Sequence, residues 1–271
     1  MKMKSKKTKN PVITLTTDFG YSYNYAGAVK AVVLSINPHA RIVDISHDIP
    51  PFDIVSGAFA LGTTYNYFPK GTIHMAVVDP GVGGFRKPIL VETEDYYFVG
   101  PDNGIFSLVE QKSEVLHIYE LNQKQYFLEH VSSTFHGRDV FAPVAAHLSK
   151  GVSADKMGMP VKTFEILEAF EVEIHSDRIA GQVLMIDGFG NVITNIDNGV
   201  FTKTLNGRSF TIHVKDELIQ NIYRTYSDAP LLSKIALFGS SGFLELAISQ
   251  GAFVNSVPVR VGDEILIEIG H

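Results

Sequence analysis

The first half of the chain alternates short apolar runs with segments of helical spacing. Such alternation is typical of parallel βαβ units, whose helices cover both faces of a sheet. We therefore expect a layered α/β domain with a mostly parallel sheet. The expected strands are 12–17, 41–45 and 72–78, and the expected helices are 25–36, 54–67 and 139–148. A β-hairpin is expected from two further strands, 89–93 and 96–99.

The second half follows a different pattern, with short β-branched runs and little helix between them. Residues 150–162 contain two glycines, one proline and no clear period, so we expect the domain boundary there. The prediction is an α/β domain over 11–161 and an antiparallel β domain, a sandwich or barrel, over 162–271. Its expected strands are 182–186, 192–196, 209–214, 235–238, 257–261 and 264–269.

Composition excludes several classes of protein. The chain has no cysteine, which removes disulfides, thiolate metal sites and cysteine nucleophiles. Residues 1–10 hold five lysines and no acid, and they predict a disordered tail. Without this segment the formal charge of the chain changes from −6 to −11, and such an acidic protein is not expected to bind nucleic acid. Polar residues interrupt the apolar run at 11–18, and no run approaches membrane-spanning length. We expect a cytoplasmic protein with no membrane partner.

A glycine-rich loop follows the third expected strand. Asp79 lies where that strand ends, in the region where open α/β sheets hold ligands. The glycines at 81, 83 and 84 allow a tight turn that returns Arg86 toward the carboxylate, so the two can pair. The alternative is a simple turn capped by Asp79 with a solvated arginine. A dinucleotide fingerprint is rejected, because Arg86 replaces its third glycine and no helix follows.

Other polar residues stand at the ends of expected elements. Asp18 ends the first strand and could bind a ribose diol or cap a turn, and His136 could be a base or a helix-entry residue. Asp139 is better explained as the N-cap of the following helix than as a catalytic group. Asp79, His136 and Asp139 could in principle ligate a metal, but no H-E-x-x-H or Asp-rich loop spacing is present, so we expect none.

Two glycine motifs occur in the second half. Residues 187–191 could bring Asn191 against a planar ring, or could form an ordinary β-turn. Residues 239–242, Gly-Ser-Ser-Gly, do not fit the G-x-S-x-G nucleophile elbow and favour a turn or a substrate contact.

Six motifs occur in order between residue 12 and the C-terminus. They are Thr17-Asp18-Phe19-Gly20, Pro50-Pro51-Phe52-Asp53, Val78-Asp79-Pro80-Gly81-Val82-Gly83, Gly100-Pro101-Asp102-Asn103-Gly104, Phe135-His136-Gly137-Arg138-Asp139 and Asp187-Gly188-Phe189-Gly190-Asn191. Together they resemble the S-adenosylmethionine hydroxide adenosyltransferases, which share their fold with the fluorinating and chlorinating enzymes. The resemblance implies an N-terminal α/β domain, a C-terminal β domain and a homotrimer that binds S-adenosylmethionine between domains of neighbouring subunits.

The resemblance also implies an activity and a set of site residues. The expected reaction converts S-adenosylmethionine and water to adenosine and L-methionine by hydroxide attack at C5′, without a cofactor. Halogenating relatives lack the acid at the position of Asp79, so a halogenase is the weaker alternative; a non-catalytic S-adenosylmethionine-binding protein and a nucleoside hydrolase are others. The implied residues are the triad Asp79, Arg86 and His136, Asp18 for the ribose, Phe52 and Phe135 around the sugar and sulfonium, Asp187 for the methionine amino group, Asn191 for the adenine edge, and Ser241 as a ligand contact.

Overall fold

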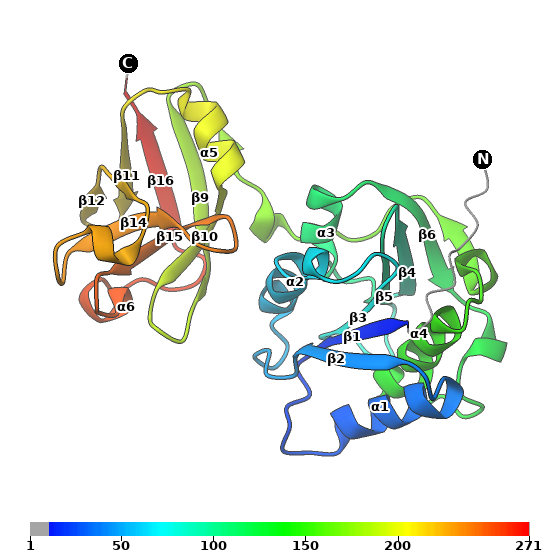
Figure 1. The fold of residues 1–271 in the computed structure, drawn as a ribbon. Helices are drawn as coiled ribbons and strands as arrows, with labels where there is room; N and C mark the ends of the chain where they lie inside the picture. Colours follow the sequence, from blue (N-terminus) through cyan, green and yellow to red (C-terminus); the bar gives the residue numbers. More distant parts are fainter. Residues whose placement is uncertain (1–10, 271) are drawn as a thin grey trace. The chain divides into compact units, whose positions relative to one another are not determined.

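The computed structural model describes residues 11–270 and divides the chain into two compact units (Figure 1). The lysine-rich segment 1–10, expected to be a disordered tail, lies outside the described residues. The first unit ends at Leu167 and the second begins at Glu168, whereas the sequence placed the boundary after residue 161. Residues 162–167 stay with the first unit because the amides of Glu165 and Leu167 donate to Asp102 Oδ1 at 2.7 Å and Ser107 Oγ at 2.9 Å.

The first unit is built on a seven-stranded sheet of order β2-β1-β3-β5-β4-β6-β7. The ladders from β2 to β5 are parallel, as the alternating pattern predicts, and the ladders through β4, β6 and β7 are antiparallel. The predicted hairpin corresponds to β4 and β5, whereas β6 and β7 were not expected. The strands are β1 (Val12–Thr17), β2 (Arg41–Ser46), β3 (Ile73–Val77), β4 (Pro88–Thr93), β5 (Tyr97–Pro101), β6 (Val115–Leu121) and β7 (Gly158–Val161).

Helices cover both faces of this sheet (Figure 1). Met75 and Val77 belong to the core under α1 and α4, while Ala76 and Val78 belong to the core under α2 and α3, as the two-residue period of a strand requires. The α/β layering is therefore confirmed. The helices are α1 (Tyr25–Ile36), α2 (Ile54–Gly62), α3 (Ser107–Lys112) and α4 (Ala142–Ser149), with short turns η1 (Tyr65–Tyr67), η2 (Lys124–Tyr126), the π-helical η3 (Gly137–Phe141) and η4 (Ala154–Lys156).

Two predicted helices differ in extent from the observed ones. The helix expected over 54–67 ends at Gly62, because the amides from Thr64 onward donate to carbonyls three residues back and the chain tightens into η1. The helix expected over 139–148 begins instead with the π-helical turn η3. None of the helices between residues 11 and 270 is long and apolar enough to cross a bilayer.

The second unit is a nine-stranded sheet of order β12-β11-β16-β9-β10-β15-β14-β13, with β8 paired to β9. Every ladder except β13 with β14 is antiparallel, which confirms the predicted class. The strands are β8 (Glu173–Ile174), β9 (Arg178–Ile186), β10 (Val192–Asp197), β11 (Phe210–Val214), β12 (Glu217–Ile219), β13 (Ile222–Tyr223), β14 (Lys234–Phe238), β15 (Phe243–Ile248) and β16 (Glu264–Ile269). The helices and turns are η5 (Glu168–Phe170), α5 (Asn198–Leu205), η6 (Tyr226–Asp228) and α6 (Phe253–Ser256).

The prediction of a strand over 257–261 is wrong. Val257 and Val259 are buried in the core, but Pro258 between them has no amide to offer a ladder, and the segment pairs with no strand of the described chain. The observed strand β15 was missed because all six of its side chains are buried, so it shows no alternation of polar and apolar residues.

Candidate active site

The ends of β1 and β3 bring the first group of predicted residues to one edge of the parallel sheet. Thr17 pairs with Val77 in the register of these neighbouring strands, so Asp18 and Asp79 both follow the same end of the sheet. The loop after Asp79 packs on the segment that precedes His136. Gly83 has φ +75°, and a Cβ there would lie 2.2 Å from the Ser133 carbonyl oxygen, so only glycine fits.

Asp79, Arg86 and His136 form one hydrogen-bonded cluster. Arg86 Nε donates to Asp79 Oδ1 at 2.9 Å and Arg86 Nη2 donates to Asp79 Oδ2 at 2.5 Å. The same Nη2 lies 2.8 Å from His136 Nδ1. The side chains of Asp79 and Arg86 are only 5% and 9% exposed, and the guanidinium also lies 5.4 Å from the centre of the Phe141 ring. The fold thus holds all three groups in one partly desolvated arrangement.

The hydrogen bond from Arg86 determines the tautomer of His136. A guanidinium can only donate, so Nδ1 must be the acceptor and the proton of the neutral imidazole is on Nε2. Burial, and then the positive charge of Arg86, lower the pKa of His136, which stabilises this neutral form. The imidazole also has a hydrogen-bonding interaction with the backbone of Ser132. The cluster therefore presents a neutral imidazole beside a carboxylate whose oxygens retain lone pairs, a combination able to bind and polarise a water molecule.

Asp18 is brought into contact with Phe52. The Phe52 amide donates to Asp18 Oδ2 at 3.0 Å, and Phe52 itself has φ +69° and is 69% exposed. A positive φ is uncommon for an aromatic residue, and strained backbone positions cluster at active sites, ligand clamps and switch regions. The contact joins the loop that follows β1 to the loop that follows β2.

Phe135 lies in an aromatic cluster that sequence reasoning missed. Its ring meets the rings of Phe19 and Tyr25 edge-on at 5.6 and 5.3 Å. A Cβ on Gly137 would lie 3.0 Å from Phe19, so the turn bearing His136 packs directly on the loop bearing Asp18. The aromatic residues directly after Asp18 and at the start of α1 were the available signal for this contact.

Asp139 is not the N-cap that the sequence predicts. It lies inside η3, fully buried, and accepts the Ser132 amide at 2.8 Å and Arg138 Nε at 2.6 Å. These bonds hold the backbone just before His136.

The remaining predicted residues belong to the second unit. Asp187 Oδ1 accepts the amides of Phe189 and Asn191 at 2.9 and 2.8 Å, and Asn191 Nδ2 donates to Asp187 Oδ2 at 3.1 Å. The segment 187–191 is thus a turn closed by Asp187, with its two predicted ligand residues in contact. Ser241 is half-buried in the turn between β14 and β15, where the Gly242 amide donates to the Gly239 carbonyl at 3.0 Å.

Sequence reasoning missed a hydrogen bond to a buried acid in this unit. Tyr226 donates its hydroxyl to Glu245 Oε1 at 2.5 Å, and Glu245 is only 6% exposed. The available signal was a lone acidic residue inside the apolar run of residues 243–248.

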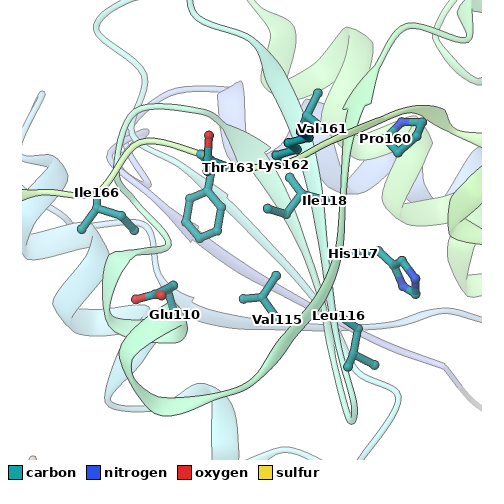
Figure 2. Close-up of a pocket in the computed structure, with 11 residues that line it drawn as sticks. Glu110, Val115, Leu116, His117, Ile118, Pro160, Val161, Lys162, Thr163 and Ile166 are labelled. Atoms are coloured by element: carbon teal, nitrogen blue, oxygen red, sulfur yellow. The ribbon is translucent and has the colours of Figure 1, made fainter.

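The first unit also has a surface pocket of about 330 Å³ beside α3, β6 and β7 (Figure 2). Apolar side chains of Val115, Ile118 and Val161 line it together with Glu110 and Lys162. None of the triad residues lines this pocket, so it is separate from the cluster described above.

Comparison with known proteins assigns this arrangement to a family. The model of the SAM hydroxide adenosyltransferase N-terminal domain matches residues 13–158, and that of the C-terminal domain matches residues 181–266. The chain belongs to the SAM hydroxide adenosyltransferase family.

Known members span nearly the whole chain. The (R)-S-adenosyl-L-methionine hydrolase of Methanocaldococcus jannaschii is 39% identical, with 87% of this chain and 88% of that protein covered. The fluorinase of Nocardia brasiliensis is more distant, at 24% identity with 97% and 98% covered. The crystal structure of an uncharacterized conserved protein from Thermotoga maritima superimposes with a TM-score of 0.85 at 35% identity, covering 94% of this chain and 99% of that one.

Proposed function

We propose that this family member hydrolyses S-adenosylmethionine to adenosine and L-methionine. The observation that carries the proposal is the hydrogen-bonded cluster of Asp79, Arg86 and a neutral His136 at the edge of the parallel sheet. Relatives named as (R)-S-adenosyl-L-methionine hydrolases at 39% and 33% identity support the same substrate.

The chemistry requires an activated nucleophile and little else. An oxygen–C5′ bond forms while the C5′–sulfur bond breaks, and the bonding pair leaves with sulfur as a neutral thioether, so no general acid is needed. Attack of a hydroxide-like oxygen on a sulfonium partly cancels charge, which a partly desolvated pocket favours. Alignment of water, C5′ and sulfur lowers the entropic part of the barrier.

The geometry suggests a division of roles in the triad. Arg86 cannot accept a proton, and the lone pair of His136 Nδ1 is occupied by Arg86 Nη2. Asp79 is then the group that takes the proton of water, while the neutral imidazole of His136 helps to position the water. The single guanidinium of Arg86 contacts both Asp79 and His136 and holds them in position.

The other predicted residues complete the proposal. Asp18 binds the ribose diol, with Phe52 and Phe135 around the sugar and sulfonium, and Asp187, Asn191 and Ser241 contact the methionine and adenine parts. A homotrimer with sites shared between subunits, a cytoplasmic location and activity without metal or cofactor stay predictions.

Product analysis in ¹⁸O-labelled water tests the function. We expect adenosine labelled at the 5′ oxygen, together with methionine, from S-adenosylmethionine and the purified chain. Unlabelled adenosine, free adenine, or substrate recovered unchanged would each contradict the proposal. A halogenated nucleoside formed in the presence of chloride or fluoride, in place of adenosine, would favour the halogenase alternative.

A further inference from the structure

The second unit contains a buried carboxylate without a cationic partner among residues 11–270. Glu245 occupies the middle of β15 and is 6% exposed, with apolar residues on both sides of it in the strand. Burying an unpaired carboxylate is costly, so acidic residues are rarely buried without a cation or several donors. The proposed hydrolysis mechanism does not use this residue.

The immediate contacts of Glu245 leave one of its oxygens available. Oε1 accepts the Tyr226 hydroxyl at 2.5 Å. Oε2 lies against Gly239, where an added Cβ would be only 2.5 Å away, and none of the described residues donates a hydrogen bond to it. The glycine that begins the turn of residues 239–242 therefore provides room for this carboxylate.

A second acid lies on the other side of β10. Val192 pairs with Ile186 on β9 and with Leu246 on β15, so Asp187, next to Ile186, and Glu245, next to Leu246, flank the same stretch of β10. Burial raises the pKa of Glu245, the hydrogen bond from the Tyr226 hydroxyl lowers it, and the negative charge of Asp187 raises it, so that the net shift is upward. A bound cation would reduce the repulsion between the two acids and would give Oε2 a hydrogen-bond donor.

We propose that Glu245, together with Asp187, receives the α-ammonium group of the methionine part of the substrate. The proposal rests on the proposed function and adds a specificity-determining residue to the role that the family resemblance gives to Asp187. An ammonium has three donors and suits two carboxylates that each keep a free lone pair. Tyr226 holds the Glu245 carboxylate in place through Oε1.

A comparison of two substrates tests this assignment. Glu245→Gln keeps the shape and an acceptor for Tyr226 but removes the charge. We expect its KM for S-adenosylmethionine to rise at least about tenfold with kcat within a few-fold, since charge-assisted hydrogen bonds contribute roughly twice as much as neutral ones. For the deamino analogue, which has a butyrate chain in place of the methionine part, wild type and variant should have the same KM. Glu264→Gln, an exposed acid on β16, is the matched control and should change neither value.

Equal losses on the two substrates, or no loss on either, would overturn the assignment. Gly239→Ala provides a second variant, because its Cβ would displace Oε2, and the same loss confined to the amino-bearing substrate is expected. If the wild type does not hydrolyse S-adenosylmethionine, the proposed function fails, and calorimetric titration then decides the ammonium site separately. In that case wild type should bind L-methionine more tightly than 4-methylthiobutyrate, and Glu245→Gln should lose this preference; its retention would refute the site.

Discussion

Replacing Asp79 by asparagine is the sharpest perturbation of the triad. The amide keeps the shape of the carboxylate but can offer an oxygen to only one of Arg86 Nε and Nη2, which donate to Asp79 at 2.9 and 2.5 Å. The other nitrogen then faces an NH₂ group. The guanidinium must shift, and its Nη2 contact with His136 at 2.8 Å is disturbed as well.

Two losses combine in the expected magnitude. Removing a positioned base costs roughly 10²–10⁴ in rate, or about 3–5 kcal/mol of barrier. Leaving a donor of the nearly buried Arg86 unpaired costs a further ~1–3 kcal/mol, which appears mainly as lower stability. We expect single-turnover hydrolysis by Asp79→Asn to fall by roughly 10²–10⁴ while S-adenosylmethionine affinity stays within a few-fold.

The assay combines single-turnover rates with equilibrium binding and urea unfolding. Asp95→Asn is the control, because it makes the same change at a partly exposed ion pair with Lys70 in the same unit and should leave the rate unchanged. Asp79→Asn combined with His136→Ala should cost much less than the sum of the two single changes, since both act on one water. Near-wild-type turnover in Asp79→Asn, or additive losses in the double variant, would refute the reasoning.

Three further outcomes are expected. Asp18→Ala should weaken substrate binding by about 1–3 kcal/mol, and a 2′-deoxy substrate should bind the wild type poorly without a further loss in the variant; unchanged affinity in Asp18→Ala would exclude the ribose role. The pKa of His136 is lowered from 6.5 and the neutral form is required, so kcat/KM should fall only as the pH drops below 6.5. A fall of kcat/KM that begins above pH 6.5 and follows the NMR titration of His136 would contradict the assignment. Burial lowers the pKa of His74 to about 3, so the unfolded chain takes up a proton below pH 6.5 that the folded chain does not. Stability should therefore decrease by roughly 2–3 kcal/mol from pH 7 to 4.5 through this residue, and urea unfolding of His74→Phe should lack that component.

Sequence patterns determined the layered first unit and the β class of the second. Strand and helix periods are local properties: the alternation of Met75 and Val77 with Ala76 and Val78 follows from the two faces of β3, and the parallel β1–β3 ladder places Asp18 and Asp79 at one edge. The pairing of Asp79 with Arg86 was likewise predictable, because the glycines between them can form only a short loop.

Tertiary structure decided what depends on contacts between distant segments. The Nη2 to Nδ1 bond that fixes the tautomer of His136 joins residues fifty positions apart, and no local pattern reports it. The π-helical turn at Gly137–Phe141 replaced a predicted N-cap because the Asp139 carboxylate bonds backward to Ser132, outside any helix. The burial of Glu245 follows from the position of β15 inside the sheet, because the same residue on an edge strand would be an ordinary solvated acid.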